Sequence, residues 1–369
     1  MKEADPGVKH YFRRGKMKYS NLDVLRSVAI ITVLIDHLIP TLHTELGFGT
    51  PFILGFTAHI GQAGVLAFFV HTSIVLMMSL ERLQEQASAI TLRFYLRRAF
   101  RIFPLSWVII AGVLLLGLPS NTWRAPDEIS LPVILANVSL IQNIWTKKQV
   151  IQPLWSLAYE MQMYLILPIL FSLIQKQKGR KLMFVLLIIC SAGGYCLAQK
   201  TGGRLNMAAY LPCFVAGVWS FGLRKVTIPR LSSMLWLPLV IGLVLVYAWL
   251  HKTEPEPVYW QGWIYCTILG ALIPLFLNIQ SRSLKWICNQ IARYSYGMYL
   301  LHVPVLYLVF RFLQVADSAV GSVLFFTLTL LGSITVYYLV EEPLIELGRR
   351  LSEPKNRLGD RIRAVVAKT

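Results

Sequence analysis

Long apolar segments alternate with short polar segments along almost the whole chain. A helix needs about 20 apolar residues to cross the hydrocarbon core of a bilayer, and ten segments reach or approach that length. Because these segments carry few charges, the pattern predicts an all-α fold, a polytopic bundle of transmembrane helices. The predicted spans are 20–40, 61–80, 101–118, 153–174, 182–198, 207–222, 233–250, 259–278, 294–314 and 319–340.

The segment 131–145 is shorter and contains Asn137, Gln142 and Asn143. Cytoplasmic loops are enriched in Lys and Arg, so the basic loops indicate whether this segment crosses. If it does not cross, the basic loop at 176–181 and those that follow it lie on the same side as the basic N-terminus. We therefore expect about ten spans, both termini in the cytoplasm, and a segment 131–145 that is interfacial or re-entrant on the outer side.

The composition agrees with a membrane protein and excludes other classes. Of the 369 residues, 56% are hydrophobic and 15% charged, whereas soluble domains have about 25% charged residues. The net charge of +18 comes from short loops and two tails rather than from a basic domain, so no nucleic-acid partner is expected. We expect a basic cytoplasmic segment 1–19 without a cleavable signal peptide, a membrane domain 20–345 and a basic cytoplasmic tail 346–369. The five cysteines lack the spacing of a metal site, and no metal is expected.

Ionisable residues inside the predicted spans are the candidates for function, because charged groups are costly in hydrocarbon. Arg26 and His37 lie eleven residues apart in the first span, on one helix face and about 16 Å apart along the axis. Arg26 is expected near the cytoplasmic end and His37 in the outer half, where a neutral imidazole could act as a base. Alternatively, Arg26 pairs with Asp23, and His37 bonds only to a neighbouring helix.

Two further arginines, Arg98 and Arg101, are three residues apart and project together at the start of the third span. Arg binds phosphate as a planar fork, so a phosphate site is expected here, although juxtamembrane arginines commonly only set orientation. In the fourth span, Glu160 is expected about 10 Å from the outer surface, near the depth of His37, with Tyr164 one turn further along. Glu160 could orient the histidine or simply tie two helices together.

The last two predicted spans also carry polar residues. Ser295, Tyr299 and His302 form a stripe aimed into the bundle, as suited to helix packing as to a site. The tenth span ends with two acids followed by Pro343, and an acid at a helix C-terminus opposes the helix dipole. A cationic partner, Arg98 or Arg101, is therefore expected for this acidic end.

The same positions form motifs that resemble those of the acyltransferase 3 family of integral-membrane acyltransferases. Arg26 with His37 resembles its Arg-x10-His signature, and Arg98 with Arg101 its Arg-x-x-Arg motif. The resemblance covers about residues 20–345. The other matching elements are Trp155-Ser156-Leu-Ala-Tyr-Glu160 followed by Tyr164, Tyr296-Gly-Met-Tyr-Leu-Leu-His302, and Glu342-Pro343 for a Glu-x-Pro element.

The chain departs from the family pattern in the second span. Many relatives read Phe-Phe-Val-Leu-Ser-Gly, whereas this chain has His71 and Thr72 after Phe-Phe-Val and Ser73 in place of the glycine. The departure implies a difference in helix packing or in the acyl group preferred. His71 itself is predicted to be mainly structural.

The resemblance implies transfer of an acyl group, usually acetyl, from cytoplasmic acetyl-CoA to a hydroxyl of an extracytoplasmic carbohydrate or glycolipid, in the bacterial cytoplasmic membrane. It further implies that Arg98 and Arg101, with Arg26, hold the CoA phosphates, and that His37 is the general base. Direct attack on the thioester and an acyl-histidine relay both fit these residues. The remaining implied site residues are Glu160, which would orient His37 or the acceptor, and the supporting Asp23, Tyr164, His302 and Glu342.

Two other functions also fit parts of this pattern. A transporter or flippase of small acids or lipid-linked sugars would need a polar pathway through the bundle but no CoA. A structural family member that only binds partners would need none of the motifs. The acceptor, the acyl chain transferred and the oligomeric state have no signature in the sequence.

Overall fold

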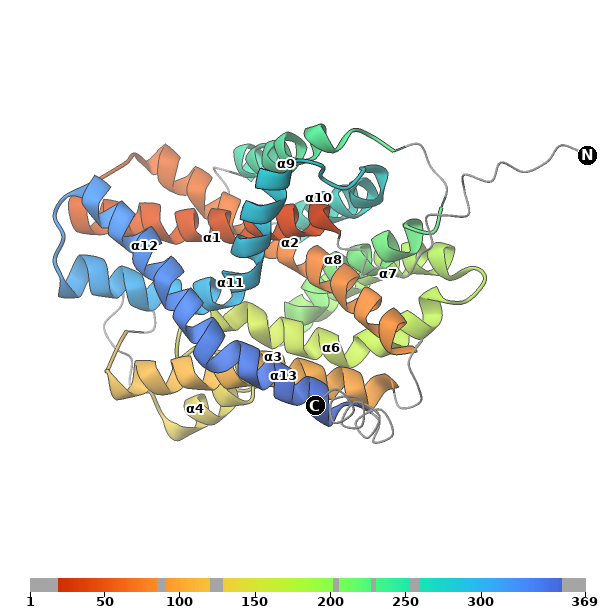
Figure 1. Ribbon diagram of the computed structural model, residues 1–369, viewed down its shortest axis with the longest axis horizontal. Helices are drawn as coiled ribbons and strands as arrows, with labels where there is room; N and C mark the ends of the chain where they lie inside the picture. Colours follow the sequence, from red (N-terminus) through yellow and green to blue (C-terminus); the bar gives the residue numbers. More distant parts are fainter. Residues whose placement is uncertain are drawn as a thin grey trace, which may run out of the picture.

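The computed structural model describes residues 19–84, 90–119, 129–201, 206–226, 230–251 and 259–353, which fold into a bundle of helices (Figure 1). Within these ranges no β-strand forms, and a single isolated bridge joins Leu231 to Phe276. The helices are α1 (Ser20–Leu46), α2 (Pro51–Gln84), α3 (Ile90–Leu115), α4 (Leu131–Val138), α5 (Gln142–Trp145), α6 (Leu154–Ile174), α7 (Gly179–Lys200), α8 (Asn206–Leu223), η2 (Ser233–Leu235), α9 (Trp236–His251), α10 (Tyr259–Leu272), η3 (Ile273–Leu275), α11 (Arg282–Leu306), η4 (Tyr307–Phe312), α12 (Ser318–Val336), η5 (Tyr337–Glu341) and α13 (Glu342–Leu351).

Seven helices of the described chain are long and apolar enough to cross a membrane. They are α2, α3, α6, α7, α8, the η2–α9 unit and the continuous helix from α12 to α13. The other three predicted spans are helical as well, but α10 has only 14 residues, and α1 and α11 carry polar and ionisable residues. The all-helical membrane fold is thus confirmed, whereas the count of ten spans and the side on which the termini lie stay predictions.

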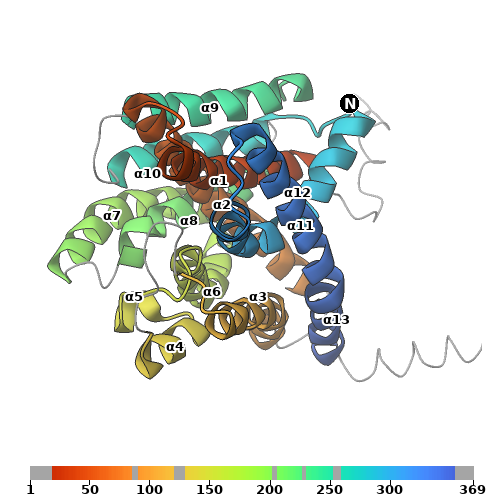
Figure 2. The same cartoon turned by 90° about the vertical axis from the view of Figure 1, so that its left-hand side faces the viewer.

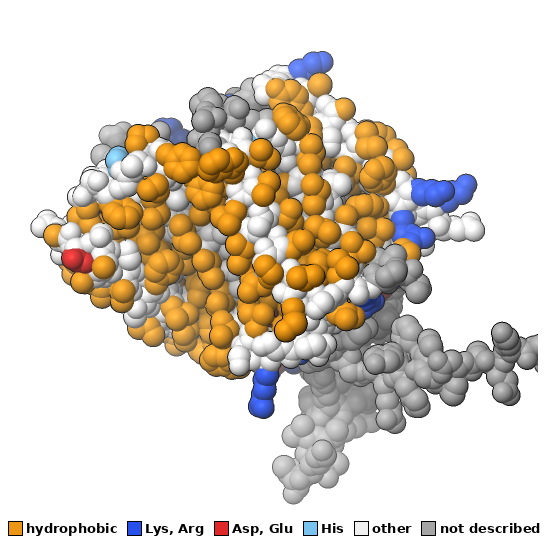
Figure 3. Space-filling model, turned by 90° about the horizontal axis from the view of Figure 1, so that it is seen from above, with side chains coloured by type: hydrophobic (Ala, Val, Ile, Leu, Met, Phe, Trp, Pro, Cys, Tyr) orange, Lys and Arg blue, Asp and Glu red, His pale blue; other side chains and the backbone are white. Residues whose placement is uncertain are grey.

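The surface of the bundle is apolar over a wide area. In α9, Trp249 and Leu250 are 56% and 65% exposed, and in α7 Ile189 is 58% exposed. Figure 3 shows one face covered largely by hydrophobic side chains, with Lys and Arg near its margins. A continuous apolar face of this extent suits contact with lipid rather than with water, which fits a multi-pass integral membrane protein.

The segment 131–145 folds into α4 and α5, of eight and four residues. Each is far shorter than the roughly 20 residues that a span requires. Polar side chains hold the segment together: the Asn137 amide donates to the Lys148 carbonyl (2.9 Å), and its Oδ1 accepts from the Val150 amide (3.0 Å). The indole of Trp107 donates to the Val138 carbonyl (2.9 Å) and so attaches α4 to α3.

Three helices begin well before the spans predicted for them. α2 begins at Pro51 rather than 61, α3 at Ile90 rather than 101, and α11 at Arg282 rather than 294. Hydropathy detects only the part of a helix that suits lipid, whereas the backbone hydrogen bonds continue into more polar sequence. As a result Arg98 and Arg101 lie in the interior of α3, not at its start.

α1 and α2 lie side by side near the middle of the bundle (Figure 2). Gly61 and Gly64 let α2 approach α1 closely, because a Cβ at either position would collide with Asp36 or with Thr32. Small residues serve this purpose at helix contacts in membranes. The N-terminus of α1 is anchored by Asn21, whose amide donates to the Leu277 carbonyl (3.0 Å) and whose Oδ1 accepts from the amide of residue 279 (3.1 Å).

The departure from the family pattern in α2 is accommodated by α8. Ser73 is fully buried, and Gly217 of α8 lies opposite it. A Cβ at position 217 would lie only 2.6 Å from the Ser73 Cβ. The close approach of α8 to α2 at this point thus depends on Gly217, on the helix that faces Ser73.

Candidate active site

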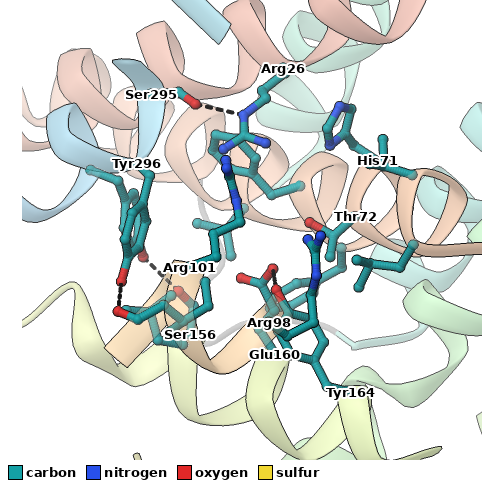
Figure 4. A pocket seen from close by; sticks show the side chains of 18 residues that line it. Arg26, His71, Thr72, Arg98, Arg101, Ser156, Glu160, Tyr164, Ser295 and Tyr296 are labelled. Atoms are coloured by element: carbon teal, nitrogen blue, oxygen red, sulfur yellow. Dashed lines mark hydrogen bonds between the residues drawn. The ribbon is translucent and has the colours of Figure 1, made fainter. Parts of the chain in front are cut away.

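Five helices surround a cavity of about 280 Å³ that we call the arginine cavity. Arg26 extends into it from α1, and Arg98 and Arg101 extend into it from α3. Figure 4 shows these three side chains pointing into the same space. The structure therefore brings together the three arginines that the sequence motifs single out, although they come from helices about 70 residues apart in the sequence.

The three guanidinium groups have no acidic partner close by. In the described part of the chain, no ion pair within 4.0 Å involves any of them. Arg26 donates from Nε to the Ser295 hydroxyl (2.6 Å) and lies 6.0 Å from the centroid of the Phe68 ring. The Nε of Arg98 is buried without a hydrogen-bond partner among these residues. Half-buried cations without an ion pair suit a multiply charged anion, because charge withdrawn from water is costly unless it is paired.

The acid that faces the arginine cavity is Glu160, and it is bound to Tyr164. The Tyr164 hydroxyl donates to Glu160 Oε1 at 2.5 Å, a short charge-assisted bond one helical turn along α6. A contact of Glu160 with His37, one of the roles considered for this acid, is not observed, because Glu160 lines the arginine cavity and His37 lines a different one. The sequence predicts that Glu160 and His37 lie at similar depths in the membrane. It does not predict how far apart they lie across the bundle.

A second cavity, of about 370 Å³, contains His37 and His302, and we call it the histidine cavity. The two imidazole rings meet edge to face, with 4.7 Å between their centroids. His37 Nδ1 lies 3.0 Å from the Val33 carbonyl and 3.4 Å from Asp36 Oδ2. The carboxylate next to the histidine is therefore its sequence neighbour Asp36, not Glu160.

The hydrogen bonds of both rings indicate the same tautomer. His37 Nδ1 faces the Val33 carbonyl, and His302 Nδ1 lies 2.7 Å from the Tyr299 carbonyl. A carbonyl only accepts, so in the neutral ring Nδ1 carries the proton and Nε2 keeps its lone pair. Nε2 of His302 is buried without a partner among the described residues. The histidine cavity thus offers imidazole nitrogens that can accept a proton.

The polar stripe of α11 links the two cavities. Ser295 lines the arginine cavity, His302 lines the histidine cavity, and Tyr299 lines both. Val65 of α2 also lines both. The Tyr299 hydroxyl lies 2.7 Å from the Ser156 hydroxyl of α6. The cavities are therefore neighbours with a shared wall, and the stripe contributes to both as well as to packing.

The acid expected opposite the arginines is Glu341, not Glu342. Glu342 is exposed, whereas Glu341 ends the π-helical segment η5 and is 2% exposed. Neither carboxylate oxygen of Glu341 has a hydrogen-bond partner within the described residues. No ion pair within 4.0 Å joins it to an arginine there, so the expected pairing is not observed, and Arg101 and Arg26 act on it only at longer range. Glu341 stands two residues before Pro343, so the Glu-x-Pro spacing itself could have identified it.

Asp23 does not belong to either cavity. It accepts a hydrogen bond from the Asn289 amide of α11 (3.3 Å), while Arg26 bonds to Ser295 instead of to this acid. The pairing of Arg26 with Asp23, and a supporting role of Asp23 at the site, are thus not observed.

His71, which the sequence predicts to be mainly structural, lies in the site. His71 lines the arginine cavity and is buried, and its Nδ1 has no hydrogen-bond partner among the residues described. The signal was present in the sequence, since His71 stands where many relatives carry an apolar residue.

Comparison with known proteins agrees with the motifs. The model of an acyltransferase domain matches residues 19–341. The regulator of hypoxia-inducible factor 1 of Caenorhabditis elegans is 23% identical, over 95% of this chain and 84% of that protein. The putative peptidoglycan O-acetyltransferase YrhL of Bacillus subtilis is 25% identical over 89% of this chain and 55% of that protein. The peptidoglycan O-acetyltransferase OatA of Listeria monocytogenes is 24% identical over 84% and 53%, respectively.

The chain thus spans about half the length of these two bacterial relatives. No solved structure shows significant similarity to it.

Proposed function

The chain belongs to the acyltransferase family whose domain model matches residues 19–341, and on this premise we propose that it is a membrane O-acyltransferase. It moves an acyl group, acetyl in the simplest case, from acyl-CoA on the cytoplasmic side to a hydroxyl of an extracytoplasmic carbohydrate or glycolipid. The proposed location is the bacterial cytoplasmic membrane. The observation that carries the proposal is a cavity lined by three arginines, none of them in an ion pair within 4.0 Å among the described residues, that shares a wall with a cavity of two histidines.

The arginine cavity supports acyl-CoA as donor. Coenzyme A carries several phosphate groups, and Arg26, Arg98 and Arg101 supply guanidinium donors without competing acids within 4.0 Å among the residues described. Arg pairs with phosphate through two parallel hydrogen bonds. Glu341 offsets part of the positive charge when no donor is bound, since its charge interacts with Arg101 and Arg26.

The histidine cavity supports the transfer step. His37 lies eleven residues beyond Arg26 on α1, about 16 Å along the helix axis, so an extended donor held at the arginines can bring its thioester toward the imidazole. His37 Nε2 removes the proton of the acceptor hydroxyl, and the hydroxyl oxygen forms a bond to the thioester carbonyl carbon. The C–S bond then breaks, and the thiolate leaves with the proton from His37. Asp36, 3.4 Å from His37 Nδ1, stabilises the imidazolium that forms between these steps.

A carbohydrate acceptor fits the remaining lining of the histidine cavity. Trp155 and Tyr210 provide aromatic faces, and Gln152 and His59 provide hydrogen-bonding groups. Ligand sites commonly combine apolar or aromatic walls with a few polar groups that fix orientation. The bacterial relatives are named as peptidoglycan O-acetyltransferases, which supports a cell-envelope glycan as the class of acceptor.

The test uses the purified full chain with [14C]acetyl-CoA and soluble peptidoglycan or polysaccharide fragments. We expect labelled ester on the glycan that is released by mild alkali, together with free CoA thiol. A protein without the activity leaves acetyl-CoA intact in every mixture, which would refute the proposal. A transporter or flippase would move its solute across proteoliposomes without consuming the thioester.

A further inference from the structure

We propose that Tyr299 is the movable partition between the donor and acceptor halves of the site, and that it keeps the donor thioester from water until an acceptor is bound. This inference rests on the proposed function, because it assigns the arginine cavity to the donor and the histidine cavity to the acceptor. Tyr299 acts as a positioning residue, since no bond of the reaction forms at its own atoms.

Few side chains belong to both cavities. Only Val65 and Tyr299 line both cavities among the residues that the structure describes. The Phe68 ring packs edge to face on Tyr299, with 6.3 Å between centroids, and this ring belongs to the arginine cavity. On the other side the Tyr299 ring lies 5.9 Å from the ring of His302. The tyrosine therefore stands between the aromatic side of one cavity and the imidazoles of the other.

One side-chain hydrogen bond holds the tyrosine in this position. Its hydroxyl is 2.7 Å from the Ser156 hydroxyl, and Ser156 lines the arginine cavity. The preceding residue, Trp155, lines the histidine cavity, so α6 contributes neighbouring residues to the two cavities. The hydrogen bond between Tyr299 and Ser156 closes the wall at this point. Breaking this bond and rotating one side chain would join the two spaces, with no movement of a helix.

The separation has a chemical purpose in the proposed reaction. The histidine cavity contains several polar groups and must admit a hydroxyl acceptor, so it also admits water. Water activated by His37 would attack the thioester carbonyl, and the products would be the free carboxylic acid and CoA thiol. Exclusion of water from a reactive donor is a recognised role of side chains that close a site. An acceptor that occupies the histidine cavity displaces this water, and rotation of Tyr299 then lets the donor thioester reach His37.

The first experiment measures acetyl-CoA hydrolysis without acceptor and acyl transfer with acceptor, on the same purified protein. In Tyr299→Ala we expect hydrolysis to rise about tenfold and the ratio of transfer to hydrolysis to fall by at least that factor, because the wall is lost. The affinity for CoA should stay within about twofold, because the arginines are unchanged. Unchanged hydrolysis in a folded Tyr299→Ala protein would overturn the proposal.

Two milder variants test the hydrogen bond and keep the test valid if Tyr299→Ala does not fold. Tyr299→Phe and Ser156→Ala remove the same bond, so each should raise hydrolysis by about two- to tenfold, and the double variant should show no more than either single one. Additive effects, or no effect, would contradict the role of this bond. Tyr294→Phe is the matched control, since this tyrosine of α11 bonds to Tyr338 and lines neither cavity.

A labelling experiment separates failure of the partition from failure of the proposed function. In Thr72→Cys, a membrane-impermeant maleimide added from the outer side should label residue 72 slowly, and the addition of Tyr299→Ala should speed labelling several-fold. The parent chain, with its own cysteines, gives the background. If the wild type consumes no acetyl-CoA but labelling depends on Tyr299, only the enzymatic proposal fails. Equal labelling in both backgrounds overturns the partition itself.

Discussion

His37 and His302 pack edge to face, 4.7 Å between ring centroids, although they stand 265 positions apart in the chain. Each directs Nδ1 to a main-chain carbonyl and keeps Nε2 available to accept a proton. In the proposed reaction the two rings share one cavity but differ in surroundings. His37 has Asp36 beside it, whereas His302 is 1% exposed and has no acid within 4.0 Å among the described residues.

The first prediction concerns the assignment of the base. His37→Gln should lower acyl transfer by at least about 100-fold, the usual contribution of a general base, while protein yield and CoA affinity stay normal. His43→Gln is the matched control, because His43 lies on the same helix, its ring lies 3.1 Å from the Phe48 carbonyl, and it lines neither cavity. Transfer rates with saturating acetyl-CoA provide the measurement. A larger loss in His302→Gln than in His37→Gln would reverse the assignment.

A second prediction compares two adjacent arginines. Arg98→Ala should weaken CoA binding by about 10- to 100-fold, as expected for loss of hydrogen bonds to a charged group. Arg97→Ala should change binding little, because Arg97 donates to the Ser352 hydroxyl (2.7 Å) and lines neither cavity. Calorimetry with CoA measures both. Arg98→Lys should restore little of the CoA affinity, since an ammonium lacks the planar fork of a guanidinium. Equal losses of affinity in Arg97→Ala and Arg98→Ala would argue against the donor site.

Two adjacent acids provide the third prediction. Glu341→Gln should lower the stability of the empty protein by about 1–3 kcal/mol, because it leaves the charges of Arg101 and Arg26 less compensated. Glu342→Gln changes an exposed residue and should leave the melting temperature unchanged. Thermal unfolding in detergent, with and without CoA, measures the effect. CoA should recover part of the loss in Glu341→Gln, since its phosphates supply negative charge to the same cavity.

The fourth prediction addresses His71. His71→Leu removes a buried nitrogen that has no partner among the residues described, so the empty protein should be as stable as the wild type or more stable. If Nδ1 binds the donor, CoA affinity should fall about two- to tenfold, the range for one hydrogen bond. The measurement is the increase in melting temperature on addition of CoA. If CoA raises the melting temperature of His71→Leu as much as that of the wild type, His71 has only a structural role.

The helices and the arginines could be predicted from the sequence because both depend on local pattern. Apolar segments predicted the positions of the membrane helices, and the Arg-x-x-Arg spacing placed Arg98 and Arg101 on one face. Their meeting with Arg26 was implied by the family resemblance, and the structure places all three in one cavity.

The acids were harder to place, for two physical reasons. Glu341 and Glu342 are neighbours at a π-helical segment, where the α-helical period no longer tells which residue faces inward. Glu160 and His37 lie on separate helices, and the sequence gives depth along each helix but not the direction across the bundle. The helical pattern does not predict a contact between Asp36 and His37, because residues adjacent in a helix point about 100° apart. The Asp36 side chain nevertheless brings its oxygen to 3.4 Å from the imidazole.

The stripe of α11 has a consequence for how such an enzyme can change. Ser295, Tyr299 and His302 belong to one helix, and between them they line both cavities. A substitution that tilts or shifts α11 to suit a bulkier sugar would also move the Ser295 hydroxyl, which accepts the hydrogen bond of Arg26. New acceptor preferences should therefore arise through α6 and the loops around it, while α11 remains nearly invariant during divergence.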